Sequence, residues 1–157
     1  MRWKLLVASL AMLMLGVAGC GSSSSSTSSS RSGPSASKGP GPVRIYRLVL
    51  AGATETPRGA PTGTGAAVIT FHDSSMVCWR FAHLHGFIDA TAAHIHIGLK
   101  GTSGNVVVPL STGPRLHHQG CVPVSAALVK AIERHPRNYY VNIHSLRYPG
   151  GAVRAQL

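Results

Sequence analysis

The apolar positions after residue 42 fall into short runs of β-branched and aromatic residues, separated by glycine, proline and other turn formers. Short runs of this composition predict β-strands, and turn signals at this spacing predict an antiparallel all-β domain. We therefore expect an antiparallel β-sandwich or Greek-key barrel of about seven strands with one short helix. The expected strands are residues 43–50, 66–71, 76–84, 92–97, 106–110, 139–144 and 152–157.

One segment departs from this strand pattern. Residues 126–135 (AALVKAIERH) are mostly good helix formers, follow Ser125 as a candidate N-cap and end before Pro136. Leu128 and Ile132 fall on the same face at helical spacing. The sequence therefore predicts a single short helix that packs over the edge of the sheet.

Two of the expected strands carry histidines at alternating positions. In AAHIHIG, His94 and His96 alternate with isoleucines, so strand pleating places the two imidazoles on one face and the aliphatic side chains on the other. In YYVNIHS, His144 shares a face with Asn142, and the aliphatic residues lie opposite. If these strands are neighbours, the three histidines form one cluster on the outer face of the sheet.

The first residues of the chain have the pattern of an export signal. Residues 1–19 combine a positively charged start, a mainly apolar stretch of thirteen residues at 5–17 and a small residue before Cys20. A stretch of thirteen residues is too short for a helix to span a hydrocarbon core of about 30 Å. The ending VAGC resembles the lipobox of bacterial lipoproteins, which implies an acylated Cys20. The alternative is an ordinary cleaved signal with an incidental cysteine.

Residues 20–42 are expected to be a lipidated cysteine and a linker rich in serine, glycine and proline. After Cys20 this segment contains no aliphatic side chain larger than alanine, so it cannot form a core. A flexible tether of this length reaches roughly 25 Å. The folded domain then comprises residues 43–157. We expect it to lie in the cell envelope, on the extracytoplasmic side, with membrane lipid as a partner through the acyl chains of Cys20.

Three cysteines are present, and two remain if Cys20 carries lipid. An exported protein meets an oxidising compartment, which favours a disulfide between Cys78 and Cys121. Such a bridge would contribute about 2 to 4 kcal/mol to a small domain. The alternative is two buried free thiols.

The folded part is basic. From residue 43 onward, eleven Lys and Arg against four Asp and Glu give 11 − 4 = +7 with neutral histidines. These basic residues are scattered and do not alternate with stacking aromatics, and the export signal removes the chain from the cytosol. We therefore expect no nucleic-acid partner, and favour attraction to anionic lipids, to a wall polymer or to an unidentified envelope protein.

Three ordered motifs resemble the CHRD domain, which was first named in chordin and is widespread in bacterial exported proteins. They are LVLAGATETP, TAAHIHIGLKGTSGNVVVPL and YYVNIHSLRYPGGAVRAQL, and together they cover about residues 47–157. The positions that match the characteristic ones of the family are Glu55, Pro57, His94, His96, Asn142, His144, Pro149, Gly150, Gly151 and Arg154.

The resemblance implies a compact, mainly β domain with a short helix before the YVNIH strand. In chordin these domains belong to an extracellular antagonist of growth-factor signalling, whereas the microbial members have no settled activity, so the resemblance supplies no reaction. This sequence departs from the usual pattern at Thr56, where valine is more usual, and at residues 155–156, where a glycine is commoner after Arg154.

Imidazole is the commonest metal ligand, so the histidines suggest a metal site. His94 and His96 lie about 7 Å apart at Cα in a strand, which lets their rings converge on one ion, and His144 would be the third ligand. An all-imidazole site suits copper or zinc. The alternative is that the histidines only fasten loops to the sheet through hydrogen bonds. In either case we expect Glu55, Asn142 and Arg154 to support the cluster.

The remaining histidines carry weaker signals. His83 and His85 repeat the His-x-His spacing near a turn at Gly86 and are expected to be a solvated strand end. His117 and His118 fall in a loop, where adjacent side chains point apart.

Catalysis has little support in the sequence. The chain has four carboxylate side chains and no GxSxG, Walker or HExxH motif. We therefore expect no catalytic residue and a non-enzymatic binding module that takes copper or zinc. Two alternatives stay open: an adhesion or protein-interaction module with structural histidines, and a copper/zinc redox enzyme similar to superoxide dismutase.

Overall fold

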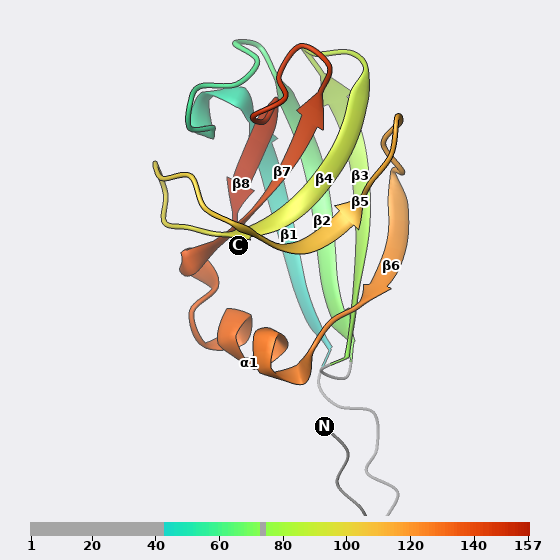
Figure 1. Ribbon diagram of the computed structural model, residues 1–157, viewed down its shortest axis with the longest axis vertical. Coiled ribbons are helices and arrows are strands. Elements are labelled where there is room, and N and C mark those ends of the chain that lie inside the picture. The colour runs from blue at the N-terminus through green and yellow to red at the C-terminus, as the bar shows by residue number, and fades with distance from the viewer. Residues whose placement is uncertain (1–42, 73–74) are drawn as a thin grey trace, which may run out of the picture. The chain divides into compact units, whose positions relative to one another are not determined.

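A computed structural model of the protein describes residues 43–72 and 75–157. They form one antiparallel sheet that curls into a nearly closed barrel, with a short helix at one end (Figure 1). The strands are β1 Arg44–Ala51, β2 Thr64–His72, β3 Met76–His85, β4 Ala90–Ile97, β5 Val106–Ser111, β6 Gln119–Pro123, β7 Tyr139–Ser145 and β8 Val153–Gln156. The helices are η1 Gly52–Thr54, α1 Ala126–Arg134 and η2 Pro136–Asn138.

The strand order is β5-β4-β7-β8-β1-β2-β3-β6 in one continuous sheet. The predicted all-β antiparallel class is confirmed, and the structure decides in favour of a barrel over two facing sheets. The expected strands are all present, and an eighth, β6, is added. Its sequence QGCVP has a glycine, a proline and no apolar alternation, so only its pairing with β3 makes it a strand.

The barrel interior is filled from every long strand. Ile69, Phe71, Val77, Ile95 and Ile143 are all at most 1% exposed, and each contributes about 1.5 to 3 kcal/mol by leaving water. Ile97 is an exception to the predicted alternation, because it is 44% exposed. Ile97 is the last residue of β4, and the pairing of β4 with β5 already ends at His96, opposite Val106.

Helix α1 follows the sequence prediction. The Ser125 side chain accepts a hydrogen bond from the Leu128 backbone N–H at 3.2 Å, which caps the helix start. Val129 and Ile132 are buried against the core. The helix closes the lower end of the barrel in Figure 1. No helix in the described residues is long and apolar enough to cross a membrane.

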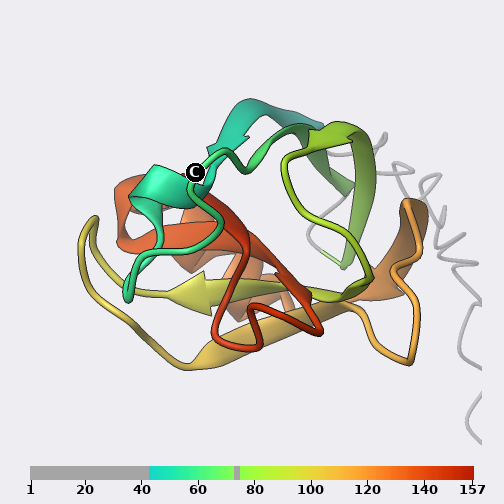
Figure 2. The ribbon, with the colours of Figure 1, turned by 90° about the horizontal axis from the view of Figure 1, so that it is seen from above.

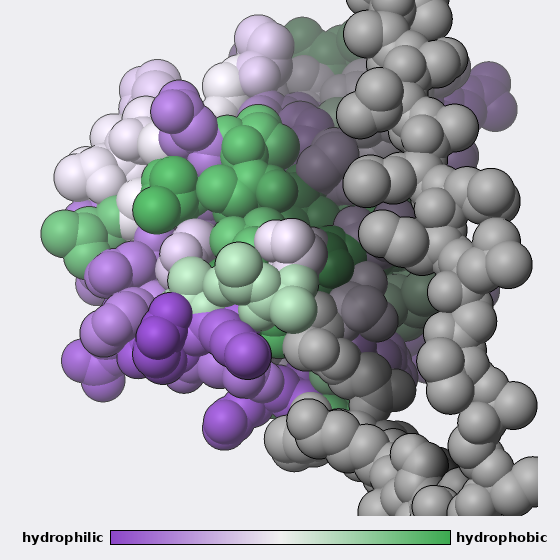
Figure 3. Space-filling view, turned by 60° about the horizontal axis from the view of Figure 1, so that its bottom comes forward, coloured by the Kyte–Doolittle hydropathy of each residue, from purple (hydrophilic) through white to green (hydrophobic). Residues whose placement is uncertain are grey.

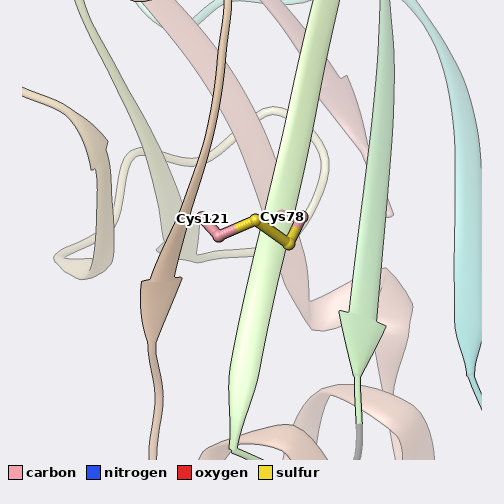
Figure 4. Close-up of a disulfide and its surroundings, with 2 residues drawn as sticks. All are labelled: Cys78 and Cys121. Carbon is pink, nitrogen blue, oxygen red and sulfur yellow. A yellow bond between two sulfur atoms is a disulfide. The ribbon is translucent and has the colours of Figure 1, made fainter.

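The predicted disulfide is present. Cys78 and Cys121 are directly opposite one another on β3 and β6, and their Cα atoms are 4.0 Å apart (Figure 4). The bond joins residues 43 positions apart in the sequence. Strand β6 is short, stands at one end of the sheet order and pairs only with β3, so the disulfide adds a covalent link to that single pairing.

A loop covers the outer face of β4, β7 and β8. This covering loop, residues 98–105, connects β4 to β5 and lies on the same side of the barrel as η1 (Figures 1 and 2). The Ser103 hydroxyl donates to the Thr56 carbonyl at 2.6 Å, which joins the covering loop to the segment after η1. Side chains on this outer face are therefore buried or half-buried, although they point away from the barrel interior.

Candidate metal centre

The histidine cluster, His94, His96 and His144, stands on two adjacent strands. Strands β4 and β7 pair antiparallel, with His94 opposite Asn142 and His96 opposite Tyr140. Because the strands are neighbours and the pleat aims these side chains outward, the three imidazoles meet. One ligand atom from each ring lies within 4.8 Å of the other two. No other set of three or more His, Cys, Asp or Glu side chains with this proximity occurs in residues 43–72 and 75–157.

His94 and His144 make the closest contact in the cluster. His94 Nδ1 lies 3.0 Å from His144 Nε2, and the His144 Nδ1–H donates to the Pro149 carbonyl at 2.8 Å. That carbonyl fixes the tautomer of His144, so its Nε2 carries a lone pair. In the metal-free protein the His94 Nδ1–H donates to this lone pair.

His96 is held on both sides. Its Nδ1 lies 2.9 Å from the Gly104 carbonyl, and its Nε2 lies 3.0 Å from Asn142 Oδ1. Both of these oxygens are hydrogen-bond acceptors. A neutral imidazole has only one N–H, so His96 donates a hydrogen bond to only one of them. Its ring also stacks on Tyr140, with centroids 4.7 Å apart and planes 5° from parallel. His96 is therefore the most constrained of the three rings.

Arg154 locks the covering loop over this cluster. Its Nη1 donates to the Thr102 carbonyl at 2.7 Å and its Nη2 to the Leu99 carbonyl at 2.9 Å. The guanidinium lies 3.3 Å from the centre of the Tyr140 ring, and the residue is 1% exposed. Because Tyr140 also stacks on His96, the Arg154 guanidinium, the Tyr140 ring and the His96 ring form one stack, which holds the His96 ring in place.

Glu55 is buried beside the same face. It is 6% exposed, its Oε2 accepts from the Thr56 N–H at 3.2 Å, and its Oε1 has no hydrogen-bond partner among the described residues. Burial raises the pKa of Glu55, whereas the nearby Asn142 amide, the Thr56 N–H and Arg154 oppose the rise. Gly151 lies against this carboxylate with a φ of +137°, and a Cβ at that position would collide with Oε1.

The electrostatics of the cluster favour neutral rings. Burial, reinforced by His144 and His96, lowers the pKa of His94 to about 4. Burial also lowers the pKa of His144, with a contribution from His96, although the Pro149 carbonyl partly offsets it. Neutral imidazole is the form that binds a metal ion.

The geometry allows an ion to enter between His94 and His144. Tetrahedral coordination with metal–nitrogen distances of about 2.0 to 2.1 Å places ligand nitrogens about 3.3 Å apart, close to the 3.0 Å between these two atoms. His96 has to give up one contact, because both of its nitrogens already face oxygens. The residues therefore offer two oriented ligands and a third that a small ring movement would supply.

The other residues that the sequence suggested for this site differ in how they relate to the three histidines. Asn142 contacts His96 directly, Arg154 acts through Tyr140 and the covering loop, and Glu55 makes no hydrogen bond to a histidine. His83 and His85 are exposed and stand outside the cluster. Cys20 lies outside the described residues.

Sequence reasoning missed three supports of the cluster. They are Tyr140, the Gly104 carbonyl and Gln156, none of which was assigned a role from the sequence. Gln156 Nε2 donates at 2.7 Å to both the Gly98 and the Arg137 carbonyls. The pleat gave the direction of Tyr140, whereas the carbonyl contacts depend on how the covering loop folds back.

Fold and cluster together define a class of protein: a small, disulfide-bonded antiparallel barrel that carries three clustered histidines under a loop on its outer face. The family model of the CHRD domain matches residues 46–157, so this chain belongs to the CHRD domain family. Membership suggests a non-enzymatic binding or interaction module. No curated protein and no solved structure matches the chain.

Proposed function

We propose that this protein is an exported, lipid-anchored binding module that holds a copper or zinc ion on its histidine cluster. The observation that carries the metal proposal is the 3.0 Å approach of His94 Nδ1 to His144 Nε2, on neighbouring strands. Two nitrogens at this distance suit one shared ion, and a copper or zinc ion would bind there after the His94 proton moves from Nδ1 to Nε2 of the same ring, which leaves a lone pair on both facing nitrogens.

The low pKa of His94, about 4, supports the proposal, because the ring is neutral at physiological pH without any cost of deprotonation. The Pro149 carbonyl supports it too, since a hydrogen bond from the remote imidazole nitrogen orients a ligating ring. All-nitrogen donor sets bind copper and zinc better than magnesium or calcium, and copper binds more tightly than zinc at equal geometry. When bound, the ion would link β4 to β7 across the outer face.

A second candidate function has its own support. Both ring nitrogens of His96 and both of His144 lie within hydrogen-bonding distance of protein atoms. This is expected if His96 holds the covering loop in place and His144 holds the β7–β8 connection. In that case the histidines are structural and the domain is an adhesion or protein-interaction module. A dismutase-like redox enzyme has less support, because no carboxylate joins the group of three histidines in the described residues.

Export and anchoring rest on the sequence of residues 1–42, which lie outside the described residues. The charged start, the apolar stretch and the VAGC ending support an acylated Cys20, with membrane lipid as the partner and the domain held at the cell envelope. Nothing in the basic surface calls for nucleic acid as a partner.

The metal proposal is tested by titrating Cu(II) and Zn(II) into the full-length chain, purified in detergent, against a chromophoric chelator. We expect one ion per chain, and about a hundredfold weaker binding after His94→Ala or His144→Ala. His118→Ala is the matched control, because His118 is exposed and lies outside the cluster. Equal, weak metal uptake by the unmodified chain and its three variants would contradict the metal site and leave the histidines with a structural role only. Superoxide dismutation by the copper-loaded protein no faster than by free copper would exclude the redox enzyme.

A further inference from the structure

Strand β1 has one edge that is almost without a partner. It pairs with β2 at eight positions, from Arg44 to Ala51, but with β8 only at Ala51, which lies opposite Arg154. Along residues 44–50 the backbone N–H and C=O groups that point away from β2 therefore have no ladder partner in the described part of the chain. A strand edge in this state is a template for another strand.

A groove of about 300 Å³ runs beside this edge. Arg47, Leu48 and Val49 line it from β1, and Ala155 and Gln156 line it from β8. A second hollow of about 520 Å³ shares Gln156 and Lys100 with the groove. The groove lies at the seam between β1 and β8, and the second hollow, which has no β1 residue in its lining, adjoins it at Lys100 and Gln156.

The lining of both hollows is basic and apolar. Arg47, Lys100 and Arg137 contribute positive charge, and no Asp or Glu side chain lines either hollow. Val49 is 82% exposed and Leu99 is 58% exposed. The second hollow includes Arg137 of η2. Figure 3, in which the lower end of the domain comes forward, shows apolar side chains grouped beside hydrophilic ones on that face.

We propose that this seam binds an extended acidic peptide segment of a partner protein, which adds as a strand to the free edge of β1. The backbone edge supplies hydrogen bonds, Val49 and Leu99 contact the apolar side chains of the peptide, and Arg47 and Lys100 pair with its carboxylates. Seven residues of free edge correspond to about 23 Å of strand, enough for a heptapeptide. No histidine of the cluster lines either hollow, although Arg154 and the covering loop contribute to both sites, and the peptide needs no metal ion to bind.

Charge argues for this occupant over two others. A second copy of the chain would bring Arg44 and Arg47 of one β1 edge against the same residues of the other. The chain's own segment 21–42 carries no Asp or Glu and no large apolar side chain. It therefore offers no carboxylate for the basic residues of the groove and no apolar side chain for Val49.

The test measures binding of the fluorescein-labelled heptapeptide Glu-Ser-Val-Ser-Glu-Ser-Val to the full-length chain, by anisotropy at about 0.15 M salt. Its glutamates and valines fall on one face of an extended strand, as Arg47 and Val49 do on β1. We expect saturable binding that Arg47→Glu weakens by about tenfold or more. Arg115→Glu, the same charge change at an exposed loop position outside the groove, should leave the affinity within about twofold. Bound peptide should also slow amide hydrogen exchange of residues 44–50.

Backbone recognition is tested with the same peptide N-methylated at alternate residues on one edge or on the other. One of these two peptides should lose binding, because it can no longer form the ladder. Equal binding of both, or equal loss with Arg47→Glu and Arg115→Glu, would reduce the effect to general charge attraction and overturn the proposal. So would concentration-dependent dimerisation through β1, or binding that occurs only to anionic lipid vesicles.

Discussion

His94 Nδ1 and His144 Nε2 lie 3.0 Å apart, although 50 positions separate the two residues in the sequence. The contact exists because β4 and β7 pair directly, with His94 opposite Asn142, two residues from His144. Pleating then aims both rings at the same outer face. This pair is the centre of the proposed metal site, and the residues around it determine how the site responds to pH, to mutation and to metal.

The stability of the metal-free protein should fall as the pH is lowered from about 6.5 towards 4. The pKa of His94 is about 4 in the folded protein and about 6.5 in an unfolded chain, so the unfolded state binds more protons in this window. The lowered pKa of His144 acts in the same direction. We expect His94 to account for about 1 to 2 kcal/mol, less than the full shift implies because its ring is partly exposed.

Urea denaturation at several pH values, with a chelator present, measures this dependence. His94→Gln should flatten the profile, and His118→Gln should not. The raised pKa of Glu55 acts in the opposite direction: its contribution is complete below the unfolded pKa of about 4.3 and is lost as the pH rises through the folded value. A profile unchanged by His94→Gln would show that this ring does not titrate differently in the two states.

Asn142→Ala should tighten copper binding by a few-fold. The substitution removes the oxygen that lies 3.0 Å from His96 Nε2, which frees that nitrogen for an ion. Isothermal titration gives the affinity, and the nitrogen splitting in Cu(II) electron paramagnetic resonance gives the number of imidazole ligands. In the double variant with His96→Gln the gain should disappear. If Asn142→Ala and His96→Gln both leave the affinity unchanged, the ion uses two histidines and His96 only fastens the loop.

Arg154→Lys should destabilise the fold by about 2 to 4 kcal/mol. Lysine cannot reach the Thr102 and Leu99 carbonyls together while lying flat on Tyr140, so buried carbonyls lose their donors. Denaturant unfolding measures the loss, and hydrogen exchange should show earlier opening of residues 98–105. Arg115→Lys, at an exposed position, is the control and should cost less than about 0.5 kcal/mol. A loss equally small for Arg154→Lys would mean that the covering loop does not depend on the guanidinium.

Reduction of Cys78–Cys121 should lower the free energy of unfolding by about 2 to 4 kcal/mol. The bond removes conformational freedom from the unfolded chain and holds the short strand β6 against β3. Thermal unfolding with and without reductant, compared with the Cys78→Ser and Cys121→Ser double variant, measures the effect. Mass spectrometry after alkylation under non-reducing conditions should find neither of these thiols modified. Alkylation of both would contradict the bridge.

Cys20→Ser should release the protein from membrane fractions. The residue is the proposed acylation site, and once the export signal is removed residues 21–42 carry no large apolar side chain that could replace the acyl chains in a bilayer. Fractionation of cells expressing each form, with intact mass analysis, checks both the location and the lipid. Cys121→Ser serves as a matched cysteine substitution that should stay in the membrane fraction. An acylated mass in the Cys20→Ser form would place the anchor elsewhere.

Local chemistry in the sequence was enough to predict seven of the eight strands, the helix and the direction of the histidine side chains. Alternation at residues 92–96 and 139–144 gave the inner and outer faces, because the side-chain period of a strand is fixed by its backbone. Ser125 and Pro136 gave the bounds of the helix to within one residue, because capping and helix breaking depend on near neighbours. The pairing of Cys78 with Cys121 followed from counting the cysteines that remain after Cys20.

Tertiary structure alone decided which of these pieces meet. The contacts of His96 with the Gly104 carbonyl and Asn142, the column of Arg154 on Tyr140, and the free edge of β1 all join or separate residues that are distant in the chain. Strand β6 likewise exists only through its partner. Sheet order and loop placement arise from burying the whole core at once, a sum over distant contacts, whereas strand direction and helix capping are set within a few residues.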